Sequence, residues 1–242
     1  MWVMISCDNR VVCQQTLNNL EPVEKGILII NGGLDDYVGL DVPKGWDALK
    51  LTEMKGINEI LNQIFKLFPE EEYYGIIPDN CIIEAVGWEE KLRVASRGRY
   101  VVGCDDGNTD SFPFSGLRIW PGDLIRKVGW WGLPGSFATG FEWAWTKIAW
   151  DMVLWERQPT IKVIYLSHNE NAYDLEVKKH EEADKLNFDI WRKTKYYKTF
   201  RTLMFGGDKW VGRTNFPMGD DDGKETGQTS TAQKDGDNRQ AL

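Results

Sequence analysis

Histidine and cysteine are scarce in this sequence, and long apolar runs are missing. Its 242 residues include two histidines and four cysteines, and no two cysteines have the CxxC spacing of many metal and redox sites. No apolar run approaches the roughly 18 residues of a membrane-spanning helix, and no signal-peptide pattern follows Met1. We therefore expect reduced thiols and a soluble protein of the cytoplasm with no membrane partner; for a viral protein this would be the host-cell cytoplasm.

Positive charge is also in short supply. The formal net charge is -8 and the pI is about 5.0, which argues against a generally basic nucleic-acid-binding surface. The hydrophobic fraction of 42% is enough for the core of one large α/β domain. The 12 tryptophans favour, weakly, a carbohydrate or nucleotide ligand, because indole rings stack on sugars and bases.

The segment 73–92 is the most informative part of the chain. Residues 73–77 are aromatic and β-branched and predict a short strand, which ends at Pro78, Asp79 and Asn80. In an open α/β sheet, ligands bind at the carboxyl ends of the strands. Asp79 and Asn80 are therefore candidates to hold a cation or a ribose, although a plain turn would use the same residues.

Two β-α units precede this segment. Residues 1–7 predict a strand that carries Ser6 near its end and leads through Asp8 and Arg10 into a helix. Asp8 or Asn9 can cap that helix, while the backbone N–H groups and Arg10 suit a diphosphate. Residues 26–30 predict a buried parallel strand, followed by Asn31, two glycines and an acidic pair at 35–36.

Asn31 and Asp35 follow the second strand, where they could contact a nucleotide. The glycine spacing is not GxGxxG, so it is not a dinucleotide-binding fingerprint. Apolar residues at helical spacing predict a helix over 56–68 that packs on the sheet. We also expect a strand over 99–103 that ends near Asp105, as a second acidic strand end or an ordinary Asp-Gly turn.

The following third of the chain is rich in aromatic residues. Alternation over 112–121 predicts a strand that reverses direction, and 122–129 predict a short helix capped by Gly129. Residues 130–141 combine many glycines with many aromatics, which favours a loop that covers a ligand. Glu142 opens a helix predicted to run to residue 157; it is either a dipole-stabilising acid or a general base.

A last strand is expected over 160–166, and His168 follows it at the same edge of the sheet, where it could complete a metal site. His180, the second histidine, falls in a charged helix and is expected to be solvated. Beyond residue 216 the composition predicts a disordered tail.

Together these segments resemble the GT-A class of nucleotide-sugar glycosyltransferases, most closely its small viral and bacterial family-2-like members. The resemblance covers roughly residues 1–190 and is most specific over Gly75–Leu92. It is carried by DNR at 8–10, NGG with paired acids at 31–36, GIIPDN at 75–80, CIIEAVGWEEKL at 81–92, Glu142 at a helix start and YLSH at 165–168.

The resemblance implies a single GT-A-like, Rossmann-like α/β domain with a mixed, mainly parallel sheet flanked by helices. It also implies a glycosyltransferase, hexosyl or pentosyl, with a divalent cation, Mn²⁺ or Mg²⁺, on the donor diphosphate. Asn80 stands where the family usually has a second Asp. By this resemblance, Glu142 is catalytic, Asp79, Asn80 and His168 hold the metal, and the nucleotide sugar contacts Ser6, Asp8, Arg10, Asn31, Asp35 and Asp79.

For the acceptor, we assign Asp105, Trp131, Lys195 and Lys198. The segment 191–213 carries seven Lys or Arg residues against one Asp, interleaved with aromatics. This pattern suits DNA, the donor diphosphate, or an amphipathic helix that covers apolar surface. We expect a catalytic domain over 1–190, a basic aromatic extension over 191–216 and the tail over 217–242.

Three functions stay open from the sequence. The first is sugar transfer from a nucleotide-diphosphate sugar to an acceptor hydroxyl, on a modified base in viral DNA, a glycan or a small molecule. The second is a nucleotidyltransferase or pyrophosphorylase, which would also bind a metal-bound triphosphate. The third is a non-catalytic module that binds carbohydrate or nucleic acid through the tryptophans and the basic segment.

Overall fold

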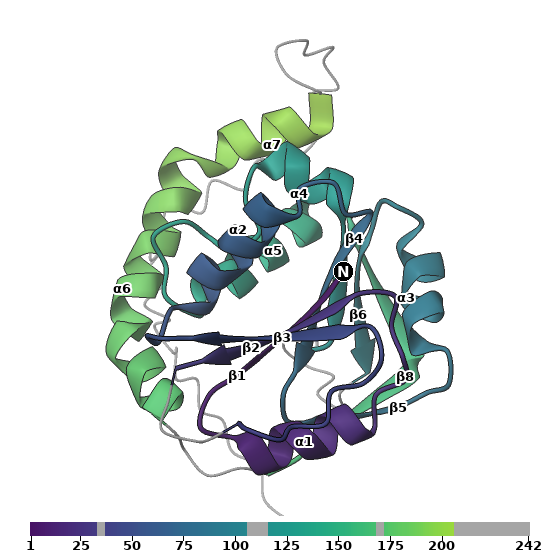
Figure 1. Ribbon diagram of the computed structural model, residues 1–242. Helices are drawn as coiled ribbons and strands as arrows, with labels where there is room; N and C mark the ends of the chain where they lie inside the picture. Colours follow the sequence, from purple (N-terminus) through teal and green to yellow (C-terminus); the bar gives the residue numbers. More distant parts are fainter. Residues whose placement is uncertain (33–36, 106–115, 168–171, 206–242) are drawn as a thin grey trace, which may run out of the picture. The chain divides into compact units, whose positions relative to one another are not determined.

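A computed structural model describes residues 1–32, 37–105, 116–167 and 172–205. Within these ranges the chain forms one eight-stranded sheet of order β3-β2-β1-β4-β7-β6-β8-β5 with helices packed on it (Figure 1). The strands are β1 (Trp2–Ser6), β2 (Gly26–Asn31), β3 (Trp46–Leu51), β4 (Tyr73–Pro78), β5 (Cys81–Glu84), β6 (Val101–Asp105), β7 (Arg118–Pro121) and β8 (Trp155–Tyr165). The helices are α1 (Arg10–Asn18), α2 (Ile57–Leu67), α3 (Trp88–Ser96), α4 (Gly122–Val128), α5 (Gly140–Asp151), α6 (Ala172–Thr194) and α7 (Tyr196–Phe205).

Parallel pairing dominates the sheet, as expected. β3, β2, β1 and β4 run parallel, and so do β6 and β8, whereas β7 is antiparallel to both of its neighbours. Every residue of β2 is buried, as is usual for strands of a parallel sheet covered on both faces. The strand that was expected to reverse direction is β7, which pairs with β4 from Tyr73↔Pro121 to Ile76↔Arg118.

Two apolar clusters cover the two faces of the sheet. In β1, Val3 packs in the cluster beneath α2, α4 and α5, while Trp2 and Met4 pack in the cluster beneath α1 and α3. Figure 1 shows α1 apart from the group formed by α2, α4 and α5. The alternation follows from the period of two along a strand. The mixed, mainly parallel α/β architecture expected from the sequence is confirmed.

The end of α5 differs from the prediction. The helix expected over 142–157 begins at Gly140 and stops at Asp151, and β8 starts at Trp155, before the strand expected over 160–166. Val153 has a positive φ of 52° between them, a conformation that a β-branched residue rarely adopts and that a helix cannot contain. The apolar residues at 153–155 therefore belong to the turn and the strand that follow the helix.

The boundary expected at residue 190 falls inside α6. Trp191 is buried in the same cluster as α2 and α5, and residues 1–209 form one compact unit. Within the described residues, no helix is both long and apolar enough to cross a bilayer. All four cysteines are described and buried, and none forms a disulfide. The tail predicted over 217–242 lies outside the described residues.

Candidate functional site

The carboxyl ends of β1 and β4 bring four polar side chains together. Asp79 Oδ2 accepts hydrogen bonds from Ser6 Oγ at 2.6 Å and from Asn9 Nδ2 at 3.3 Å. Ser6 Oγ also lies 2.8 Å from the hydroxyl of Tyr37, which in turn accepts a hydrogen bond from the Asn9 backbone N–H at 3.0 Å. The two strand ends predicted to meet at the ligand edge therefore do meet.

The proton order in this chain follows from the donors available. Because the Ser6 hydroxyl gives its one proton to Asp79, the Tyr37 hydroxyl must donate to Ser6. Burial raises the pKa of Tyr37 to about 12, so its proton is retained at neutral pH. Asn9, Tyr37 and Ser6 thus form a directed chain of donors that ends on the Asp79 carboxylate.

The turn that carries Asp79 is fixed from two sides. Thr16 of α1 donates to the Asp79 carbonyl at 2.9 Å and accepts from the Cys81 backbone N–H at 3.0 Å. Asn80 bonds to Leu166, with the Leu166 N–H donating to the Asn80 carbonyl at 2.7 Å and Asn80 Nδ2 donating to the Leu166 carbonyl at 3.3 Å. These hydrogen bonds attach the turn to α1 and to the residue that follows β8.

The predicted capping of α1 takes another form. Asn9 is the N-cap, but its side chain makes no capping bond and reaches Asp79 instead. Asp8 has a positive φ of 48° at the turn between β1 and α1, and Arg10 donates to the Val38 carbonyl at 3.0 Å. The start of α1 and its backbone N–H groups therefore lie beside Asp79, at the place where a helix dipole favours an anion.

The oxygen atoms at this edge suit a hard divalent cation. Asp79 offers a carboxylate and Asn80 an amide oxygen, and Mg²⁺ is often bound by one or two carboxylates together with waters and substrate phosphates. Within the described residues, no group of three or more His, Cys, Asp and Glu side chains could hold a metal. His168 and Asp35, which were also assigned to this site, lie outside the described residues.

A second carboxylate stands at the start of α5. Glu142 lies in the first turn of that helix and pairs with Arg118 of β7, with 2.9 Å between Oε1 and Nη2. The side chain of Arg118 is 5% exposed and that of Glu142 is 43% exposed. Arg118 also lies 5.8 Å from the ring centroids of Trp120 and Phe141. A buried cation thus holds an accessible carboxylate in place.

The start of α5 is capped from another helix. Asp184 of α6 is 2% exposed, and its carboxylate accepts the backbone N–H groups of Phe137 at 2.6 Å, Ala138 at 2.7 Å and Thr139 at 3.0 Å. These N–H groups have no carbonyl within α5 to bond. Asp184 therefore fixes the loop and the helix that present Glu142.

Two assigned contacts are corrected by burial. Asn31 is fully buried, and its side chain makes paired bonds to the backbone N–H and C=O of Lys55 at 2.9 and 2.8 Å. Trp131 is also fully buried, and its ring lies 5.1 Å from that of Tyr74. Asn31 therefore orders the entry to α2, and Trp131 belongs to the core rather than to an acceptor surface.

The loop over 130–141 is likewise anchored rather than a free cover. Asn62 accepts from the Trp131 and Gly132 N–H groups at 2.9 and 3.1 Å, and Asn58 accepts from the Leu133 N–H at 2.7 Å. A side chain at Gly132 would collide with the Asn58 backbone, since an added Cβ would lie 2.3 Å from its carbonyl oxygen. The loop is thus fitted closely to α2.

The remaining acceptor assignments lie apart. Asp105 ends β6 and pairs with Arg157 at 2.5 Å. Lys195 and Lys198 lie beyond the carboxyl end of α6, whereas Tyr173 at its start accepts a hydrogen bond from the Ile57 N–H at 3.2 Å. Since α6 has 23 residues and rises 1.5 Å per residue, the two lysines are about 30 Å from its start.

Three of the residues that build the site were missed from the sequence, namely Tyr37, Arg118 and Asp184, and Asn9 was considered only as a helix cap. Asn9 carried a signal, because it lies directly beside the assigned Asp8. The others carry none, since a single Tyr, Arg or Asp in a loop, strand or helix looks like any other until the chain is folded. His180 is half-exposed, and its ring stacks on Phe137 at 4.4 Å between centroids.

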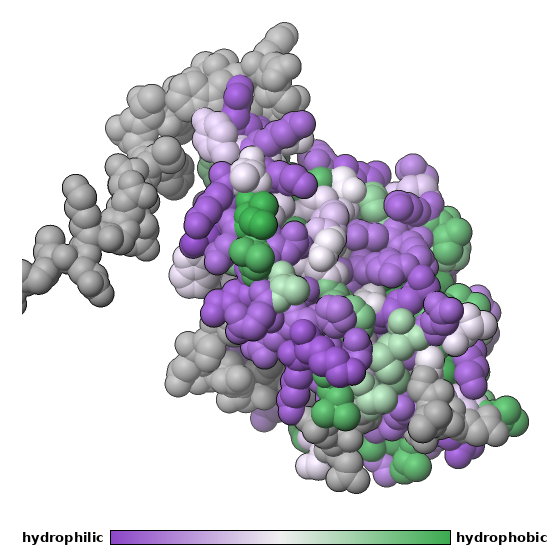
Figure 2. All heavy atoms as spheres, turned by 90° about the vertical axis from the view of Figure 1, so that its left-hand side faces the viewer, coloured by the Kyte–Doolittle hydropathy of each residue, from purple (hydrophilic) through white to green (hydrophobic). Residues whose placement is uncertain are grey.

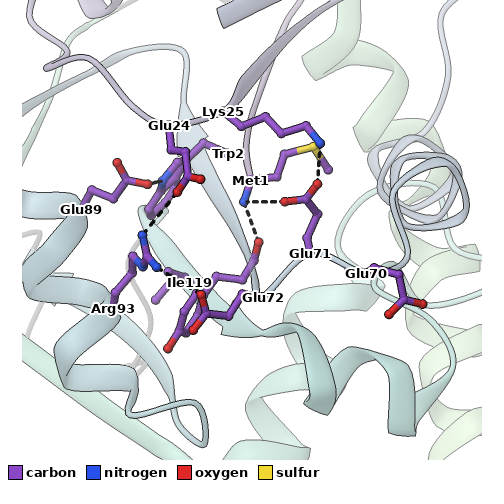
Figure 3. Close-up of a pocket in the computed structure, with 11 residues that line it drawn as sticks. Met1, Trp2, Glu24, Lys25, Glu70, Glu71, Glu72, Glu89, Arg93 and Ile119 are labelled. Atoms are coloured by element: carbon purple, nitrogen blue, oxygen red, sulfur yellow. Dashed lines mark hydrogen bonds and ion pairs between the residues drawn. The ribbon is translucent and has the colours of Figure 1, made fainter. Parts of the chain in front are cut away.

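A pocket at the opposite edge of the sheet has a different character (Figure 3). It has a volume of about 310 Å³ and lies at the first residues of β1 and β4. The Met1 ammonium donates to the Tyr73 carbonyl at 2.7 Å, Lys25 pairs with Glu71 at 2.5 Å, and Arg93 pairs with Glu72 at 3.1 Å. Burial lowers the pKa of the Met1 ammonium. Each of the three cations is thus paired with a carboxylate.

Comparisons with known proteins show what this fold resembles. No protein-family model matches the sequence, and no curated protein matches it either. Three similar solved structures are TarS of S. aureus (TM-score 0.52, 13% identity, 84% of this chain and 43% of that chain), a mycobacterial protein (0.51, 13%, 76% and 73%) and GalNAc-T7 with UDP, GalNAc and Mn²⁺ (0.52, 11%, 83% and 49%).

At such low identity the likeness concerns the fold. It supports the GT-A-like architecture expected from the sequence. The chain spans 43% of the TarS chain and 49% of the GalNAc-T7 chain. The features of those proteins beyond the matched region therefore have no counterpart in this alignment.

Proposed function

We propose that the protein transfers a sugar, a hexosyl or pentosyl group, from a nucleotide-diphosphate sugar to an acceptor hydroxyl. The observation that carries this proposal is the Asp79 carboxylate at the end of β4, held by Ser6 and Asn9 from the end of β1. The likeness to a fold solved in one case with UDP, GalNAc and Mn²⁺ supports the same donor class.

Asp79 and Asn80 are proposed to hold a divalent cation on the donor diphosphate. Bound there, the cation would neutralise the charge of the leaving diphosphate. The start of α1, with Asp8 and Arg10, lies beside Asp79 and is proposed to contact the nucleotide. His168 and Asp35 keep their proposed roles as metal ligand and nucleotide contact.

Glu142 is the proposed general base. Its carboxylate is accessible, and Arg118 holds it at the start of α5. Deprotonating an acceptor hydroxyl as the sugar carbon becomes cationic would raise its nucleophilicity. For the acceptor we propose a polyanion such as DNA, supported by five basic residues and no acidic ones over 191–205.

A thermal-shift panel of nucleotide-diphosphate sugars tests the donor proposal. With one donor at about a hundred times its Kd, binding to the folded state alone should raise the Tm by about 5 to 10 °C. This shift should depend on Mn²⁺ in the wild type and be lost in Asp79→Asn, which keeps the shape of the side chain and removes its charge.

The matched control is Asp47→Asn on the exposed face of β3, which should keep the full shift. Selective stabilisation by one donor with Mn²⁺ would support the assignment of the cation to Asp79. A shift of equal size in Asp79→Asn would show that the cation and the diphosphate bind elsewhere.

A further inference from the structure

A groove at the far end of α6 contains Lys195 and Lys198, two of the residues assigned to the acceptor. Its volume is about 460 Å³, and it lies between α4, the loop at 130–134, the end of α6 and one side of α7. Its residues combine basic, polar and aromatic side chains: Lys127, Val128, Trp130, Leu133, Pro134, Asn187, Ile190, Trp191, Lys195, Lys198, Thr199 and Thr202.

Three lysines from two separate helical regions converge on this groove. In the described part of the chain, no carboxylate lies within ion-pair distance of the ammonium groups of Lys127, Lys195 or Lys198. The nearest acid along α4 is Asp123, which forms an ion pair with Arg126 at 2.6 Å. Three positive charges therefore line a groove whose lining residues include no carboxylate, in a protein of net charge -8.

The orientation of α7 sorts its side chains by chemistry. Tyr196, Phe200 and Leu203 pack against the core, while Lys198, Thr199 and Thr202 line the groove. The groove side therefore presents polar side chains at helical spacing. Trp191 also lines the groove, and its buried indole N–H has no acceptor within the described residues.

A neighbouring pocket continues from the groove toward the candidate active site. It has a volume of about 570 Å³ and shares Leu133 and Pro134 with the groove. At its other end it is lined by Phe137, which stacks on Tyr173 at 5.7 Å between ring centroids. Phe137 lies just before α5, the helix that presents Glu142. The two pockets thus form a track along α6.

We propose that the lysine groove binds a chain of phosphodiesters and anchors a polymeric acceptor at the carboxyl end of α6, away from the transfer site. The ligand class follows from the charge, because unpaired ammonium groups in a groove bind phosphate oxygens by charge-assisted hydrogen bonds. The length of the track favours a chain over a small anion. The anchoring role rests on the proposed function, whereas binding itself does not.

An anionic bilayer is a poorer fit to the same charges. Helices that lie on membranes present a broad apolar face below their basic residues, but Tyr196, Phe200 and Leu203 of α7 pack against the core, where they are partly buried. Figure 2 looks onto the side of the molecule that carries α6, and this face is mostly hydrophilic with only small apolar groups. The positive charges also surround a hollow rather than a flat surface.

Fluorescence anisotropy with a labelled oligothymidylate of about 20 nucleotides tests the groove directly. The full chain should bind the oligomer, and log K should fall linearly with log salt concentration. The double variant Lys195→Gln/Lys198→Gln removes two phosphate contacts, so it should weaken binding about tenfold and reduce the slope by about 1.4. An abasic oligomer of the same length shows whether the bases add to the phosphodiester contacts.

The matched control is Lys91→Gln/Lys185→Gln. This variant has the same net charge as Lys195→Gln/Lys198→Gln. Both of its lysines are exposed and lie outside the groove, so it should bind the oligomer within about twofold of the wild type. Equal weakening by both variants would show non-specific attraction and overturn the proposal. So would absence of oligomer binding, or tighter binding to phosphatidylserine vesicles that depends on the same two lysines.

The donor thermal shift of the wild type, measured in parallel, separates this proposal from the proposed function. Oligomer binding without a donor-induced rise in Tm would support phosphodiester binding in the groove and contradict the proposed sugar transfer. A donor-induced rise in Tm without oligomer binding would support the donor site and contradict phosphodiester binding in the groove.

Discussion

Glu142 combines an accessible carboxylate with a buried partner, and this contrast governs its chemistry. Arg118 is 5% exposed and is held among aromatic rings, so it has little freedom to follow Glu142 into solvent. The pair therefore fixes the carboxylate while leaving one side of it open to an acceptor. A carboxylate held in this way can accept a proton without first changing its position.

The variant Glu142→Gln should lower turnover by roughly 10² to 10⁴-fold, the usual contribution of a positioned general base. The amide keeps a hydrogen bond to Arg118, so the protein should fold and keep the donor-induced shift in Tm. Turnover is measured as nucleoside diphosphate released from the donor. The control Glu90→Gln changes a first-turn acid of α3 and should leave the rate unchanged; equal losses in both variants would refute the assignment.

From the sequence, single side chains were assigned to the site where they follow strands or open helices. Asp79 was identified because it ends an apolar strand, and Glu142 because it precedes a helical pattern. Their partners could not be identified in this way. Tyr37 lies 42 positions before Asp79, and Arg118 lies 24 positions before Glu142. Only the folded sheet brings these residues together. Trp131 was misassigned because tryptophan suits a sugar-binding surface and a core equally well.

At the level of helices and strands, α5 depends on a residue from α6. Asp184 supplies the acceptor for three backbone N–H groups that precede α5. A carboxylate buried with several donors is stabilising only as long as both sides of the interaction are present. The loop and the helix that carry Glu142 are therefore coupled to the packing of α6.

The variant Asp184→Ala should lower the free energy of unfolding by about 3 kcal/mol, because buried backbone N–H groups lose their only side-chain acceptor. Urea denaturation followed by circular dichroism measures this loss. Asp189→Ala, which removes an exposed partner of Arg192 on the same helix, should cost less than about 0.5 kcal/mol. Similar losses in the two variants would mean that Asp184 does not cap α5.

Helices with a clear apolar stripe were located well, and helix ends next to strands were not. α2 lies within one residue of its predicted range at each end because its stripe is regular and Pro69 follows it. α5 was extended too far because Val153, Leu154 and Trp155 continue the apolar composition into β8. Composition alone does not show where φ changes sign at Val153.

In the described part of the chain, the order of the strands explains which side chains meet at the ends of the sheet. The parallel strands β1 and β4 are neighbours, so side chains separated by about 70 residues meet at one edge. The alternation of buried strands with amphipathic helices predicted an α/β sheet, and the resemblance to GT-A enzymes implied that this sheet is mixed and mainly parallel. The sequence did not predict the charged pocket at the opposite edge, whose residues come from strands, from α3 and from the loops at 24–25 and 70–72.

The same view explains why the basic segment could not be interpreted from the sequence. Its aromatic residues divide between the core and the surface only after α7 packs on α4 and α6. Trp191 proves to be buried, whereas Lys195 and Lys198 line a groove about 30 Å from the start of α6. Sequence alone allowed DNA, the diphosphate or a covered apolar face, and the geometry favours an anchoring role.

The most direct test of sugar transfer is to measure which phosphate product leaves the donor. Purified protein is incubated with each nucleotide-diphosphate sugar and Mn²⁺, and the products are separated by anion-exchange chromatography. The account predicts slow release of nucleoside diphosphate from one donor, which chelation of the metal abolishes. Release of pyrophosphate from a triphosphate, or no nucleoside diphosphate from any donor that binds, would contradict it.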